Sequence, residues 1–84
     1  MKTYMLPVDM IARFTESGKP TPIRFKVPDT TDVIQVNRII LQDEEKLAGN
    51  RMLIYRCATV MGNEERLFEL KYEISSCKWY LYKM

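Results

Sequence analysis

The amino-acid sequence contains no histidine and only two cysteines, so several kinds of metal and catalytic site lack their usual side chains. Structural zinc sites use four Cys or His ligands, which Cys57 and Cys77 alone do not supply. Histidine is also the commonest general base beside a catalytic nucleophile. The glycines, Gly18, Gly49 and Gly62, are far apart, so no glycine-rich phosphate loop is present. We therefore expect a protein that is not an enzyme and that binds no metal and no cofactor.

Carboxylates are the remaining candidates for catalysis or for binding a hard cation. The acids at residues 43–45 are consecutive, whereas calcium loops place their ligands at alternate positions. Glu69 and Glu73 alternate with Lys71, which is typical of a solvated cross-strand charge ladder on the outside of a sheet. These patterns indicate surface charge and not a reactive site.

Length and hydropathy predict a single domain, residues 1–84, with no membrane segment. A chain of 84 residues closes one core and little more. No run approaches the ~20 apolar residues of a membrane span, and Asp9 and Arg13 interrupt the N-terminal stretch where a secretory signal would need an apolar run. We expect a cytoplasmic protein with reduced thiols, whose two cysteines act as small apolar side chains in or near the core.

An alternation with a period of two residues dominates the stretch 65–84. Such a period predicts strands that are buried on one face. After a short turn the pattern resumes, with Trp79 and Leu81 on one face and Tyr80 and Tyr82 on the other. This stretch therefore predicts a hairpin that supplies much of the core. The apolar residues that share one face before the turn are Phe68, Leu70, Tyr72 and Ile74.

Similar alternation predicts four more strands, over residues 8–14, 23–27, 33–41 and 52–61. In the segment 33–41, Ile34 and Val36 have one parity. Ile39 and Leu41 have the other, and a β-bulge at residues 37–38 reconciles the two by switching which parity faces the core. Such a bulge would let one strand serve two faces of a small barrel.

The connections carry turn chemistry. The segment 15–19 contains Gly18, and Gly62-Asn63 is a two-residue hairpin signal. The most polar segment, Gln42–Asn50, has two alternative predictions: a helical turn that begins at Asp43, or a flexible loop.

The predicted fold class is all-β. About six strands with short connections favour sequential antiparallel pairing. Curling largely removes the exposed edges of such a sheet, so we predict a small antiparallel β-barrel or strongly curved meander, SH3-like in size. The alternative is an open meander that forms a homodimer through an edge strand.

Aromatic and basic side chains on the outward faces of two predicted strands are the candidate binding residues. Aromatic rings interleaved with lysines on a strand can stack single-stranded bases and neutralise phosphates. The alternative is that the tyrosines pack under a loop or in a homodimer interface, in a module for protein interaction. The candidate residues are Tyr80, Tyr82, Lys78, Lys83, Arg24 and Lys26.

The order of several short motifs resembles short uncharacterised β-domains of Gram-positive bacteria. The motifs are GKPTPIRF at residues 18–25, Val36, Glu69-Leu70 and the tripeptide at residues 79–81. Some such domains are attached to, or encoded beside, translesion (Y-family) DNA polymerases. The resemblance implies an accessory role in a nucleic-acid setting in bacteria, with single-stranded nucleic acid or a nucleic-acid enzyme as the partner.

Overall fold

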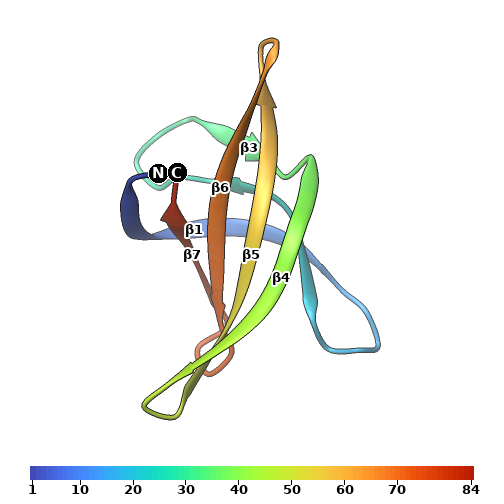
Figure 1. The fold of residues 1–84 in the computed structure, drawn as a ribbon, viewed down its shortest axis with the longest axis vertical. Helices are drawn as coiled ribbons and strands as arrows, with labels where there is room; N and C mark the ends of the chain where they lie inside the picture. Colours follow the sequence, from blue (N-terminus) through green and yellow to red (C-terminus); the bar gives the residue numbers. More distant parts are fainter.

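The computed structural model describes residues 1–84, which form one seven-stranded sheet with no helix (Figure 1). Its order is β3-β2-β1-β7-β6-β5-β4, and all neighbouring strands are antiparallel. The sheet curls into a half-barrel, so the prediction of a small, strongly curved all-β fold is confirmed. The strands are β1 (Thr3–Phe14), β2 (Pro20–Lys26), β3 (Val33–Gln35), β4 (Arg38–Leu47), β5 (Asn50–Met61), β6 (Glu64–Glu73) and β7 (Lys78–Lys83).

The first strand changes partner along its length. Leu6, Pro7 and Val8 pair with β7, whereas the part of β1 from Asp9 to Phe14 pairs with β2. The two termini consequently lie side by side (Figure 1), and Lys2 N donates to Met84 O at 2.9 Å. Because β1 belongs to two ladders that diverge, the sheet forks beyond Val8.

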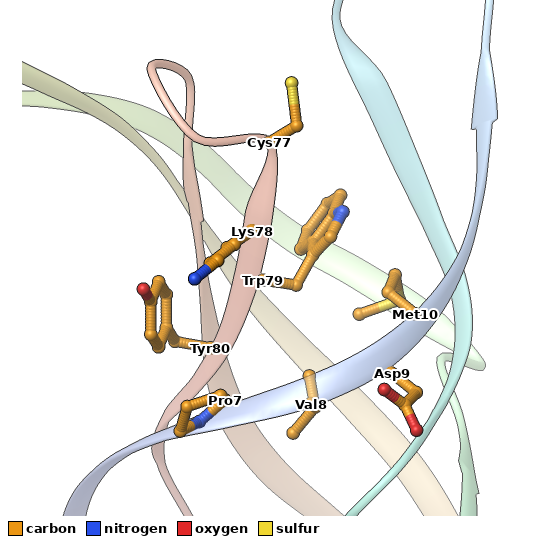
Figure 2. A pocket seen from close by; sticks show the side chains of 8 residues that line it. All are labelled: Pro7, Val8, Asp9, Met10, Cys77, Lys78, Trp79 and Tyr80. Atoms are coloured by element: carbon orange, nitrogen blue, oxygen red, sulfur yellow. The ribbon is translucent and has the colours of Figure 1, made fainter.

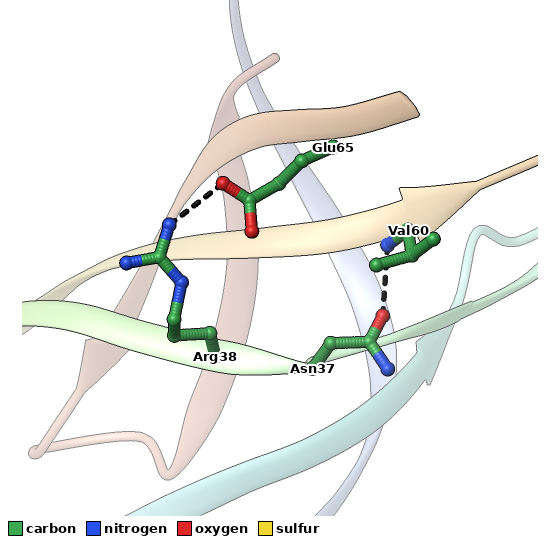
Figure 3. A network of polar contacts seen from close by, with 4 residues as sticks. All are labelled: Asn37, Arg38, Val60 and Glu65. Carbon is green, nitrogen blue, oxygen red and sulfur yellow. Dashed lines mark hydrogen bonds and ion pairs between the residues drawn. The ribbon is translucent and has the colours of Figure 1, made fainter. Parts of the chain in front are cut away.

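A bend between β3 and β4 lies against β5, so the end of β3 comes close to that strand across the curl of the sheet. The amide N of Asn37 donates to Ala58 O at 3.0 Å, and Val60 N donates to Asn37 Oδ1 at 2.8 Å (Figure 3). Next to it, Arg38 Nη2 lies 2.6 Å from Glu65 Oε1 (Figure 3). The segment 33–41, predicted as one strand with a β-bulge at residues 37–38, is therefore two strands, β3 and β4, that this bend separates.

The register shift itself lies further along, between Ile39 and Leu41. Both side chains are exposed, so the expectation that they face the core is wrong. The reason is that β4 is an edge strand with no neighbour on its outer side, and Leu41 lies opposite the exposed Arg56.

Aromatic rings from both halves of the curl fill the core. Phe25 of β2 lies 5.6 Å from Phe68 of β6, measured between ring centroids. Trp79 lies 4.8 Å from Tyr72 and 5.4 Å from Tyr55. The predicted inward face of the hairpin 65–84 is confirmed, except that Ile74 falls in the turn and is exposed.

Neither prediction for Gln42–Asn50 is correct. Strand β4 continues to Leu47, and a two-residue turn at Ala48 and Gly49 leads into β5. Both turn residues have positive φ, 50° and 84°, as a primed hairpin turn requires. The polar side chains are tolerated in a strand because this hairpin arm extends beyond the core (Figure 1).

Two of the three residues of the predicted solvated charge ladder, Glu69 and Lys71, are covered instead, whereas the third, Glu73, is partly exposed. Glu69 and Lys71 are each only 7% exposed. The central position of β6 lets longer side chains from both neighbouring strands close over its outer face. Arg56 Nη2 lies 2.9 Å from Glu69 Oε2, and Lys71 Nζ lies 3.8 Å from the centroid of the Tyr82 ring.

Two smaller predictions also differ from the structure. The first strand begins at Thr3 and not at Val8, because Pro7 is accommodated on an exposed position of the strand. Cys57 is buried in the core as expected, but Cys77 has a φ of 59° in the last turn and is exposed.

A buried hydrogen bond across the curl gives a test of the fold. The Tyr55 hydroxyl donates to Pro20 O and joins β5 to β2. Replacing Tyr55 by Phe leaves that carbonyl oxygen buried without its donor, so we expect a loss of about 1–3 kcal/mol in the free energy of unfolding, measured with urea. The same change at the exposed Tyr4 is the control and should cost less than about 0.5 kcal/mol. Equal effects at the two positions would contradict this account of the closure.

Candidate functional site

A groove lies where β1 and β7 diverge (Figure 2). Its volume is about 490 Å³. Trp79 and Met10 point toward one another on one side of β7, and Lys78 and Tyr80 project from the other side (Figure 2). The lining residues are Pro7, Val8, Asp9, Met10, Cys77, Lys78, Trp79 and Tyr80.

A second depression, of about 260 Å³, lies over β1, β2 and the start of β3. It shares Asp9 and Met10 with the first, so the two are continuous along β1. We call both together the β1 groove. The second depression is lined by Asp9, Met10, Ile11, Arg24, Phe25, Lys26 and Val33.

The β1 groove brings together four of the six residues predicted from the sequence. Lys78 and Tyr80 line its first depression, and Arg24 and Lys26 line its second. These side chains are on the outward face of the sheet. Strand β1 lies between β2 and β7 and brings them near one another, with Asp9 opposite Lys26 in register. Residues almost sixty positions apart in the sequence thus meet at one surface.

The other two predicted residues, Tyr82 and Lys83, lie outside the β1 groove. Tyr82 is half-buried over the outer face of β6, with Lys71 Nζ at 3.8 Å and Lys83 Nζ at 5.1 Å from its ring centroid. Lys71 also donates to Glu45 Oε2 at 3.1 Å. Tyr82 therefore covers a buried ion pair, which leaves Tyr80 as the tyrosine of the groove.

Ion pairing separates the cations of the protein into two groups. Four Lys and Arg residues form ion pairs, and all four are on β4, β5 or β6. Of the nine others among the 13 cations, seven lie on β1, β2, β7 or the segments beside them. These seven are Lys2, Arg13, Lys19, Arg24, Lys26, Lys78 and Lys83. The side of the molecule that carries the β1 groove thus holds most of the unpaired positive charge.

Sequence analysis missed the part of the groove contributed by β1. Asp9 is the only carboxylate that lines it, and Asp9 is exposed and is in none of the four ion pairs. Its place between two basic strands follows from the pairing of the first strand with the last. A local pattern carries no signal of that long-range pairing.

The two thiols have different environments. Cys57 is fully buried, and burial raises the pKa of its thiol to about 12. Cys77 is exposed at the rim of the first depression. A hydrogen bond with the Cys77 side chain, followed by burial, raises the pKa of Tyr72 beneath it.

The remaining features of the surface concern metal binding, a third depression and membrane spans. No three Cys, Asp or Glu side chains lie close enough together to hold a metal ion. A third depression, of about 360 Å³, is lined by Lys19, Gln42, Asp43, Glu44 and Leu53, so it carries more negative than positive charge. None of the elements is a helix long and apolar enough to cross a membrane.

Comparisons of the chain with protein-family models, with curated proteins and with solved structures gave no significant match.

The raised pKa values predict a loss of stability in alkali. Burial, followed by the charges of Tyr72 and Cys57, also raises the pKa of Tyr55 to about 12. Above pH 9 the unfolded Cys57 thiol releases its proton while the folded one retains it, so the free energy of unfolding falls by about 1.4 kcal/mol per pH unit for this group, up to its folded pKa. Tyr55 adds to this slope above pH 10.

The measurement is urea unfolding between pH 8 and the onset of alkaline denaturation, for the wild type and for Cys57→Ala. The variant should have a shallower decline with pH, whereas Tyr4→Phe, which changes an exposed side chain of β1, should not. Identical slopes in all three proteins would contradict the assignment to Cys57.

Proposed function

We propose that this protein is a non-catalytic accessory module whose β1 groove contacts single-stranded nucleic acid, alone or together with an enzyme that acts on it. The observation that carries the proposal is the gathering of unpaired cations and a half-exposed aromatic ring along one continuous groove. Phosphates are neutralised by such cations, and bases stack on aromatic side chains with little regard to sequence.

The charge distribution favours binding at the groove over unspecific binding of a polyanion to the whole surface. The net charge is only +2, so the whole molecule has little attraction for a polyanion. Ion pairing leaves only two of the six cations of β4, β5 and β6 free to compete for a polyanion; the four paired ones are Arg38, Arg51, Arg56 and Lys71. The resemblance to domains associated with translesion polymerases points in the same direction, and the exposed thiol of Cys77 suits the reducing cytoplasm.

Binding of a short fluorescent oligonucleotide of mixed sequence, followed by anisotropy, tests the proposal. Replacing Tyr80 by Ala should cost about 1–3 kcal/mol of binding free energy because a stacking platform is lost. Tyr4→Ala is the matched control, since Tyr4 is an exposed tyrosine of β1 outside the groove. Equal losses for the two variants would argue against stacking in the groove.

Salt dependence provides a second, independent test. Each phosphate contact contributes about 0.7 to the slope of log affinity against log salt for a single strand. Replacing Lys26 and Lys78 together by Gln should therefore lower the slope by about 1.4. The control replaces Lys46 and Arg66, which are exposed, unpaired and remote from the groove, and it should leave the slope nearly unchanged. Binding that is insensitive to salt would sink the proposal.

The free edge of β4 favours a second candidate function, protein interaction or homo-oligomerisation. Strand β4 is ten residues long and is unpaired on its outer side. Three consecutive aliphatic side chains near its start, Ile39, Ile40 and Leu41, are exposed, and no proline interrupts the strand. An edge of this kind is a template for pairing with another strand.

Sedimentation equilibrium at increasing protein concentration tests this candidate. If β4 pairs between copies, the wild type forms a concentration-dependent dimer and Ile40→Lys abolishes it, because a lysine on an edge strand opposes pairing. Leu67→Lys also replaces an exposed aliphatic side chain by lysine, but on β6, which is not an edge strand, and it should leave the dimer intact. A wild type that remains monomeric at high concentration and retains no partner in a pull-down would remove the candidate.

A further inference from the structure

The second depression of the β1 groove, which we call the slot, has room for one planar group. Its volume, about 260 Å³, is below the ~300 Å³ at which pockets for drug-sized ligands begin. It spans three adjacent strands, β1, β2 and β3, which corresponds to a width of roughly 10 Å. A single nucleobase is a ligand of this size.

Exposed aliphatic side chains stand at two opposite corners of this depression. Across the three strands, Val33 aligns with Lys26 and Asp9, while Arg24 aligns with Ile11 in the next row. Ile11 and Val33 are 52% and 55% exposed, although they flank a basic surface. The flat faces of a base are apolar enough to cover such side chains, whereas a phosphate is not.

The slot is lined by one carboxylate, Asp9, and by two cations, Lys26 directly opposite it and Arg24 diagonal to it. Asp9 is the only carboxylate of the groove, and it can only accept hydrogen bonds when ionised. Arg24 can only donate, and its planar guanidinium donates to two acceptors at once. The two residues are diagonal neighbours across the β1–β2 ladder, about 7–8 Å apart at the backbone. A base between them must present donors to one side and acceptors to the other.

We propose that this slot takes one unpaired base of the bound strand and selects guanine; the inference rests on the proposed function. Guanine alone offers two adjacent donors, N1–H and the N2 amino group, which match the two oxygens of the Asp9 carboxylate. Guanine also offers two adjacent acceptors, O6 and N7, which match Arg24. Adenine and cytosine place one amino group beside an acceptor, and thymine places one N–H between two carbonyl oxygens, so each leaves an oxygen of Asp9 facing an acceptor.

The slot favours a single strand over a duplex or a free nucleotide. The N1–H of guanine is occupied by base pairing in a duplex, so Asp9 reaches it only in an unpaired base. Beyond Asp9 the groove continues to Lys78 and Tyr80, which are placed to hold the next phosphate and base. A single-stranded oligonucleotide would contact both depressions, whereas a mononucleotide would contact only one.

The test uses the full chain and three oligothymidylates that each carry one central substitution, dG, dA or dC. The wild type should bind the dG oligonucleotide roughly 5- to 150-fold more tightly than the others, the discrimination expected of a good bidentate contact. Asp9→Asn should lose this preference and gain one for dA, because an Asn side chain pairs with adenine N6 and N7. Asp9 is exposed, so this change does not threaten folding.

Control variants separate charge from recognition. Glu16→Gln removes a negative charge from the exposed turn after β1, outside the groove, and should retain the dG preference. Arg24→Gln should reduce the dG preference, because it removes the contact to O6 and N7 of guanine. Affinity for plain oligothymidylate should be the same in Glu16→Gln as in the wild type, since Glu16 lies outside the groove.

The outcomes distinguish the slot from the proposed function. Salt-sensitive binding with equal affinity for the three oligonucleotides, or a dG preference that survives in Asp9→Asn, overturns the slot and leaves the proposed function standing. Absence of binding to every oligonucleotide overturns both. Guanosine 5′-monophosphate that binds as tightly as the dG oligonucleotide overturns the assignment to a strand.

Discussion

The change of partner along β1 is the constraint on which the rest of the structure depends. Up to Val8 this strand completes the ladder with β7, and from Asp9 onward it completes the ladder with β2. The divergence curls the sheet around the aromatic core and opens the groove beside Trp79. A flat sheet with the same strands would bury fewer aromatic rings and would have no fork. Fold and candidate site therefore have one structural origin.

The charged side chains of the two halves of the molecule differ in whether they form ion pairs. Strands β4, β5 and β6 carry the four ion pairs, including the buried Lys71 with its contacts to Glu45 and Tyr82. Surface ion pairs contribute little each, but these neutralise their half of the surface. Strands β1, β2 and β7 leave their cations unpaired. Charge that is not used within the fold remains available to a ligand.

The sequence was sufficient for the fold class and for most of the core, because strand alternation is a local signal. The inward face of 65–84 and the buried Tyr55 and Cys57 follow from it directly. Long-range features escaped it: the pairing of the first strand with the last, the cover over Glu69 and Lys71, and the place of Asp9 in a basic groove. The hairpin at Ala48 and Gly49 was missed because its strands are polar where they leave the core.

The most direct test of a nucleic-acid site in the β1 groove is the map of amide chemical shifts in isotopically labelled protein during titration with a short single-stranded oligonucleotide. The account predicts shifts at residues 7–11, 24–26 and 77–80 that diminish as salt is raised, while the ion-paired face of β4 and β5 stays unchanged. Shifts confined to β4, or no shifts together with line widths too broad for a chain of 10.0 kDa, would contradict it and direct attention to the edge strand.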